Sequence, residues 1–146
     1  ENMQDVCSAC HTEEYVNNFY IQYDSLIDLY NNKYALPGKE LMAAAKPLLK
    51  KAKFSNKVEW TWFELWHHEG RRSRMAASMM APDYPHWHGT YDLAKHWYTK
   101  FVPQLEDLIA KGKKAGGEKA KAADALQKKL DEVHSNEDHK WYLGQK

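Results

Sequence analysis

Several features are scarce in this chain of 146 residues, and each scarcity narrows the possible structures. Cysteine occurs twice, so no second cysteine pair is present to complete a zinc site. No hydrophobic run is long enough to cross a membrane. Basic and acidic residues nearly balance, at 21 and 20, which gives no electrostatic argument for nucleic-acid binding. No segment has a strand pattern, so we expect an all-α fold of long helices and short connections.

Both cysteines belong to the pentapeptide CSACH, which has the C-x-x-C-H pattern of a c-type haem attachment site. Cys7 and Cys10 would form thioethers with the two vinyl groups of one porphyrin, because residues three apart on a helical turn face the same side. His11 would be the proximal ligand to iron. The alternative is a disulfide or a thioredoxin-like redox pair, but such a redox pair normally follows a strand, and no strand pattern precedes Cys7.

Hydrophobic periodicity predicts five helices. They cover residues 13–34, 39–53, 58–80, 90–114 and 118–134. The first has an apolar stripe formed by Tyr15, Phe19, Tyr23, Ile27 and Tyr30. The last has a thinner stripe formed by Ala122, Leu126, Leu130 and Val133. We expect one helical domain over residues 1–146, with haem attachment in 1–12, a helical core in 13–113, and a C-terminal helix and irregular tail in 114–146.

Prolines and glycines set the expected ends of these helices. Pro37 and Gly38 predict a break, and Pro47 predicts a bend or restart. Ser55 and Asn56 are candidate N-caps for the third helix. Pro82 and Pro85 predict an ordered turn in place of a helix, and Pro103 predicts a kink or restart inside the fourth helix.

The third predicted helix carries a face that would suit a flat ring. Its members follow one another at steps of three and four residues, and they are Trp60, Phe63, His67, Gly70 and Arg74. The glycine would let a ring approach the backbone, and the arginine could bind a propionate. His68 lies about 100° around the helix from its neighbour, on the side of Arg71 and Arg72. An ordinary core or interface helix with two histidines is the alternative.

The segment MAPDYPHWHGTYD is a second candidate site. Tyr84 stands between two prolines, which fix the backbone on either side of it. His86 and His88 alternate around Trp87, and in an extended segment both imidazoles would lie on one side. A rigid corner between two helices, with aromatic side chains covering a core, is the alternative and is favoured by these residues alone.

The stretch ELWHHEGRRSRMAASMMAPDYPHWHGTYDLAKHWY resembles the C-terminal region of the octahaem hydroxylamine oxidoreductase family, which includes hydrazine dehydrogenases and nitrite-reducing members. The resemblance implies a multihaem cytochrome c type of protein, built as a trimer. It implies that Tyr84, or as second choice Tyr91, is cross-linked to the catalytic haem of a neighbouring subunit. It also implies that His11 serves a relay haem, and that His67, His68 and His88 are candidate distal iron ligands.

This chain departs from that family because it has one haem motif where the family has eight. We therefore expect a small subunit or C-terminal portion of an oxidoreductase for inorganic nitrogen compounds, inactive without a larger multihaem partner in a trimer-based hetero-oligomer. Haem attachment takes place outside the cytoplasm, so we expect a mature, periplasmic chain, or one in an equivalent compartment such as an anammoxosome. The alternatives are a nitrite-reducing member without the cross-link, and a monohaem electron carrier with Met75, Met79 or Met80 as sixth ligand.

Overall fold

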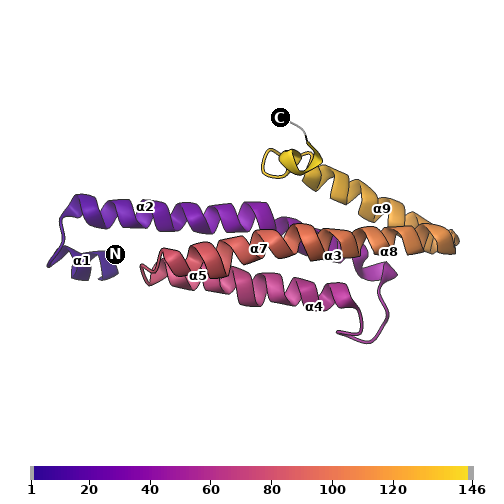
Figure 1. Cartoon of the computed structure of the whole chain (residues 1–146), viewed down its shortest axis with the longest axis horizontal. Coiled ribbons are helices and arrows are strands. Elements are labelled where there is room, and N and C mark those ends of the chain that lie inside the picture. The colour runs from indigo at the N-terminus through magenta and orange to yellow at the C-terminus, as the bar shows by residue number, and fades with distance from the viewer. Residues whose placement is uncertain (1, 145–146) are drawn as a thin grey trace.

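The computed structural model describes residues 2–144, and within that range every regular element is a helix. The all-α prediction is therefore confirmed for this part of the chain. Three long rods lie along the molecule, and α9 packs across α3 and α8 at one end of them (Figure 1). None of the described helices combines the length and the hydropathy that a membrane span needs.

Each rod is a continuous helix of several segments. The first rod (residues 13–48) contains α2 (Glu13–Tyr30), a π-helical turn (Asn31–Ala35), α3 (Leu36–Ala45) and a 3-10 turn (Lys46–Leu48). The second rod (57–78) contains α4 (Lys57–Phe63), a π-helical turn (Glu64–Glu69) and α5 (Gly70–Ser78). The third rod (83–115) contains α6 (Asp83–Pro85), α7 (Tyr91–His96) and α8 (Val102–Ala115), with π-helical turns His86–Thr90 and Trp97–Phe101 between them. The remaining elements are α1 (Asn2–Ser8), α9 (Gly117–His134) and a 3-10 turn (Lys140–Leu143).

The first and third rods each continue through a proline, so the break predicted at Pro37 and Gly38 is wrong. Pro37 follows the π-helical turn 31–35 by two residues, and Pro103 follows the turn 97–101 by the same interval. Proline has no N–H for the carbonyl four residues earlier and crowds it. A wider turn just before the proline changes the hydrogen-bond register and lets the helix continue. The kink predicted at Pro103 is accordingly a π-helical turn.

The start of α4 follows the sequence signal. Asn56 caps α4, and the Glu59 carboxylate accepts from the Asn56 backbone N–H at 3.2 Å, which forms a capping box. The bend or restart predicted at Pro47 is wrong, because the first rod ends in the 3-10 turn that contains Pro47 and residues 49–53, which were predicted to be helical, are not.

The ordered turn predicted at Pro82 and Pro85 is confirmed at Pro82, where the second rod has ended, but it is wrong at Pro85, because the third rod begins at Asp83 and includes Pro85. The first N–H groups of a helix have no partner within it, so proline in the first turn loses no hydrogen bond. The segment that follows is helical as well. His86 and His88 are therefore about 200° apart around the helix axis and do not share one side.

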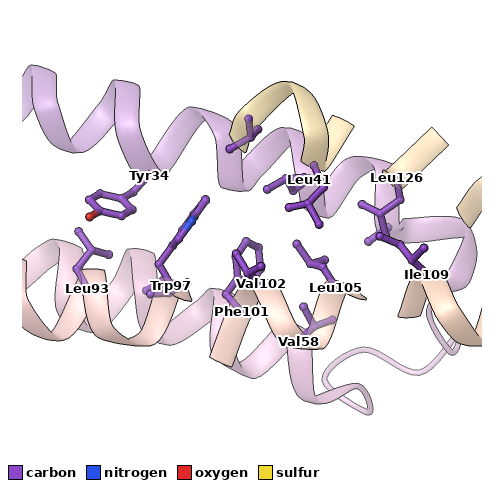
Figure 2. Close-up of a cluster of buried hydrophobic side chains, with 14 of the residues drawn as sticks. Tyr34, Leu41, Val58, Leu93, Trp97, Phe101, Val102, Leu105, Ile109 and Leu126 are labelled. Carbon is purple, nitrogen blue, oxygen red and sulfur yellow. The ribbon is translucent and has the colours of Figure 1, made fainter. Parts of the chain in front are cut away.

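The core lies where the first and third rods meet α9. Tyr34 and Leu41 of the first rod face aromatic and aliphatic side chains of the third, with Leu126 of α9 at one end (Figure 2). Eight core side chains are fully buried: Leu41, Ala45, Trp97, Phe101, Val102, Leu105, Ala123 and Leu126. The C-terminal helix thus completes the same core as the rods, with Ala123 in the buried position predicted for Ala122.

The first half of α2 is less buried than its predicted stripe implies. Tyr15 is 49% exposed, while its neighbour Val16 is buried. Tyr30, at the other end of the stripe, is buried against the second rod. The stripe is therefore a core face only where α5 and the later helices cover it.

The tail predicted to be irregular contains a buried, ordered contact; residues 145–146 lie outside the described part. His139 is 1% exposed, and its Nε2–H donates to the Lys33 carbonyl at 2.7 Å. Lys33 lies four residues before Pro37, which has no N–H to donate to this carbonyl. In the neutral ring, Nδ1 then accepts from the Tyr98 hydroxyl at 2.8 Å. The tail therefore supplies a hydrogen bond to the backbone of the first rod close to this proline.

The second and third rods approach most closely at Gly89. A Cβ at this position would lie 2.6 Å from the Ser73 Cα, so only glycine fits. Ser73 and Thr90 share a hydrogen bond at 3.1 Å beside the contact. This close approach sets the spacing of the two rods that carry the candidate site.

We expect Gly89→Ala to destabilise the fold by roughly 1–3 kcal/mol, as overpacking does, because the Ser73 backbone cannot rotate away. That loss would appear despite the gain of up to about 1 kcal/mol in helix propensity. Chemical denaturation would measure it. The control is Thr90→Ala, which removes only a hydrogen bond and should cost about 1 kcal/mol. Unchanged or increased stability of Gly89→Ala would contradict the packing described.

Stability should also depend on pH through the tail. Burial lowers the pKa of His139 from its ordinary 6.5, and burial lowers the pKa of His134 in the same way. The unfolded chain therefore binds more protons as the pH falls through 6.5, and folding free energy is lost below that pH and complete above it. Unfolding midpoints at about pH 7.5 and about pH 5.5 would measure the loss. His139→Gln keeps a donor for the Lys33 carbonyl but cannot titrate, so its loss should be smaller; an identical loss would assign the effect to other groups.

Candidate functional site

The CSACH segment begins in the last turn of α1, with Cys7 and Ser8, and continues into a tight turn. The backbone N–H groups of Cys10 and His11 both donate to the Cys7 carbonyl, at 3.1 and 3.0 Å. Both thiols are free; that of Cys10 is on an exposed residue, and Cys7 is half-buried. The two cysteines therefore belong to one helical turn, as thioether bonds to a single porphyrin require.

His11 lies at the entrance to α2. Its exposed ring stacks on that of Tyr15, with centroids 4.6 Å apart and an interplanar angle of 22°. Thr12 caps α2 by accepting from the Tyr15 N–H at 3.4 Å. A capped helix start directly after His11 fixes the backbone, while the exposed imidazole stays free to reach iron.

A pocket of about 560 Å³ opens where the second rod ends and the third begins. Small-molecule and cofactor pockets are commonly about 300–1,000 Å³. Its lining residues are His67, His68, Arg71, Arg72, Met75, Ala76, Met79, Ala81 and Tyr84. Methionine and alanine supply an apolar surface, the arginines are cationic, and the histidines offer ring nitrogens. This chemistry fits the edge of a porphyrin, which is flat, apolar and bears anionic propionates.

The π-helical turn Glu64–Glu69 brings both histidines to this pocket. His67 stacks on Phe63 with centroids 4.6 Å apart, and its Nδ1 is buried without a hydrogen-bond partner. His68 is exposed beside it, with ring centroids 5.3 Å apart. The two imidazoles lie together although a regular helix would turn them about 100° apart.

Tyr84 completes the pocket from α6. Its side chain is 47% exposed, and its ring lies 5.0 Å from that of His88. His88 is exposed and does not line the pocket itself. Tyr91 is 50% exposed and lies outside the lining as well. Of the two tyrosines considered from the sequence, Tyr84 is therefore the one that lies with the histidines and arginines.

Of the face predicted from Trp60 to Arg74, the rings of Trp60, Phe63 and His67 lie together, but Gly70 and Arg74 face elsewhere. The π-helical turn shifts the register, so that Gly70 faces Tyr30 of α2, where a Cβ would meet the phenol ring. Arg74 lies over the same ring at 4.6 Å, and its Nε donates to the Gly70 carbonyl at 3.1 Å. Gly70 therefore admits Tyr30, and Arg74 lies apart from the pocket that Arg71 and Arg72 line.

Two polar pairs were not predicted from the sequence. Glu69 is 5% exposed, and its Oε1 is 2.6 Å from Nδ1 of His96. The other pair is His139 with Tyr98, and burial is the main cause that raises the pKa of the Tyr98 hydroxyl. The spacing of the first pair, 27 residues apart on different rods, leaves no local signal.

No protein-family model, curated protein or solved structure matches this chain. The family resemblance therefore stays a prediction, carried by the residues and by the pocket that they form. Among residues 2–144, no three or more His, Cys, Asp or Glu side chains form a group that could hold a metal ion.

The two thiols give a direct test of the attachment site. In folded chain produced without haem, we expect iodoacetamide to modify both, with Cys10 faster because Cys7 is half-buried. In the haem-loaded chain neither should react, because both sulfurs would be thioethers. Mass spectrometry after timed alkylation measures this. A haem-free chain that resists alkylation until it is reduced would instead indicate a disulfide.

Proposed function

We propose that this chain is a haem c subunit, or the C-terminal portion, of a multihaem oxidoreductase that acts on inorganic nitrogen compounds such as hydroxylamine or hydrazine. It would carry one electron-relay haem of its own and supply Tyr84 to the catalytic haem of a neighbouring chain. Activity would require a larger multihaem partner. Covalent haem attachment would place the assembly in the periplasm or an equivalent compartment.

The observation that carries this proposal is the pocket lined by His67, His68, Arg71, Arg72 and Tyr84. These residues were candidates on sequence grounds alone, and they come from two rods joined by a corner. A structural corner would need apolar contacts but not two cationic and two imidazole groups beside an exposed phenol. A porphyrin edge with propionates accounts for all three kinds of group.

The surroundings of the pocket support a partner chain. Large aromatic side chains with 41–57% of their surface exposed are present on the second and third rods: Trp60, Trp66, Tyr84, Trp87 and Tyr91. Exposed aromatics are enriched in protein interfaces, where their rings become buried. The haem held by the partner could thus reach Tyr84 when the two surfaces meet.

The residues of this chain would have distinct roles. Cys7 and Cys10 would each add S–H across a vinyl group, so that the sulfur bonds to carbon, the hydrogen goes to the other vinyl carbon, and no electrons are exchanged. His11 would bind the same iron. The relay haem so held would pass electrons one at a time.

Tyr84 would modify the partner's catalytic haem. One bond between the phenol side chain and the macrocycle replaces a hydrogen on each, which releases two protons and two electrons to an oxidant such as a peroxide. A bond from Tyr84 would distort the macrocycle, and distortion is one means by which a protein tunes haem reactivity. Arg71 and Arg72 would hold the propionates and so orient the ring for that bond.

A monohaem electron carrier is the second candidate, because Met75 and Met79 line the same pocket as the histidines. Met80 is not part of it and faces a different hollow with Phe19 and Tyr23. In a carrier, one of the two pocket methionines would bind iron and raise its potential. Such a protein would be a monomer with one haem, whereas the proposed subunit would purify with a multihaem partner.

The cross-link is testable in the native assembly. Trypsin should release residues 75–95, which contain both Tyr84 and Tyr91. We expect this peptide to absorb as haem, and its mass to increase by one haem and the partner peptide that carries that haem, less two hydrogens. Tyr84→Phe should abolish the adduct, and the matched control Tyr91→Phe should keep it. An unmodified peptide from the native assembly would exclude the oxidising version and leave the nitrite-reducing one.

A further inference from the structure

The Glu69–His96 pair lies between the second and third rods. Glu69 Oε1 and His96 Nδ1 are 2.6 Å apart, and the Glu69 side chain is 6% exposed. The His96 side chain is 19% exposed, and its Nε2 is not among the buried unpartnered nitrogens. One nitrogen of this imidazole is therefore held from inside the protein while the other can be reached from outside.

No other histidine in residues 2–144 is prepared in this way. Ring-nitrogen hydrogen bonds are made by His96 and His139, and His139 uses both of its nitrogens inside the fold. His67 has the opposite arrangement, because its Nδ1 is buried without a partner. His96 alone combines a carboxylate-held nitrogen with an accessible one.

If the Glu69–His96 contact were only structural, it would lower the stability of the fold more than necessary. The second carboxylate oxygen, Glu69 Oε2, is buried with no hydrogen-bond partner. A buried carboxylate with an unused acceptor lowers stability, and a glutamine could have held the ring as well. Unsatisfied buried polar atoms in a folded protein call for an explanation, and function is a common one.

A carboxylate behind an imidazole is the usual support of a metal-binding histidine. The carboxylate keeps the proton on the nearer nitrogen, fixes the ring, and makes the other nitrogen a better ligand. One such nitrogen suffices for an iron that already has four porphyrin ligands and lacks an axial one. The Glu69–His96 pair therefore has the chemistry of an axial haem ligand.

We propose that His96 Nε2 is the distal ligand to a haem iron held by the partner chain, with Glu69 as its positioning residue. This inference rests on the proposed function, since it needs a partner with haems. His96 does not line the pocket of Tyr84, so its iron is a different one from that of the catalytic haem. The chain would thus complete the coordination of a relay haem in its neighbour. Electrons could then pass between that haem and the haem on Cys7 and Cys10.

The test uses the purified native assembly and the electron paramagnetic resonance spectrum of its haems. His96→Asn keeps a donor for Glu69 but removes Nε2, so the fold should persist. We expect one low-spin, bis-histidine haem per copy of this chain to become high-spin, and added imidazole to restore it. The matched control is His86→Asn, an exposed histidine on the same rod, which should leave the spectrum unchanged.

Glu69→Gln tests the positioning role. It keeps the size and an acceptor but removes the charge, so we expect cyanide to displace His96 from iron at a tenfold to hundredfold lower concentration. Wild-type spectra in His96→Asn would overturn the inference, while a partner with many haems in the same sample would leave the proposed function intact. An assembly without partner haems would instead refute the proposed function itself.

Discussion

The close approach of the second and third rods at Gly89 is the contact on which both candidate sites depend. A side chain there would meet the Ser73 backbone, so the two helices can be this near only with glycine at the crossing. On one side of the crossing the rods enclose the pocket of Tyr84. Towards the other end, the same spacing lets the Glu69 carboxylate reach the His96 ring at 2.6 Å. A wider separation would leave a buried charge without its partner, which proteins rarely tolerate.

Local signals predicted the helical class and most of the helical segments, because periodicity and caps are encoded by neighbouring residues. The capping box at Asn56 and the apolar stripe of α9 are examples. The helix ends predicted at Pro37 and Pro85 were wrong for a physical reason. Pro85 occupies a first turn that needs no N–H, and Pro37 follows a π-helical turn, and neither fact is visible in propensity alone.

The sequence predicted the individual residues of the candidate site, but it did not predict that they meet in one pocket. His67, His68, Arg71, Arg72 and Tyr84 were recognisable from their chemistry, and they meet because a corner folds the third rod back on the second. Gly70 and Arg74 were expected among them and lie instead against Tyr30. Glu69 and His96 could not have been paired, since 27 residues separate them and no pattern marks either.

The hydrogen bond between Lys33 and His139 affects the order in which contacts can form while the chain is synthesised. The two residues are 106 positions apart, so the first rod gains this hydrogen bond only when nearly the whole chain has been made. Small helical proteins make most of their contacts between residues that are near in sequence, and they fold fast for that reason. A nascent chain stalled before residue 139 would lack this contact and would leave the rings of Tyr34, Trp97 and Tyr98 without the imidazole that packs on them, a surface that a chaperone could bind.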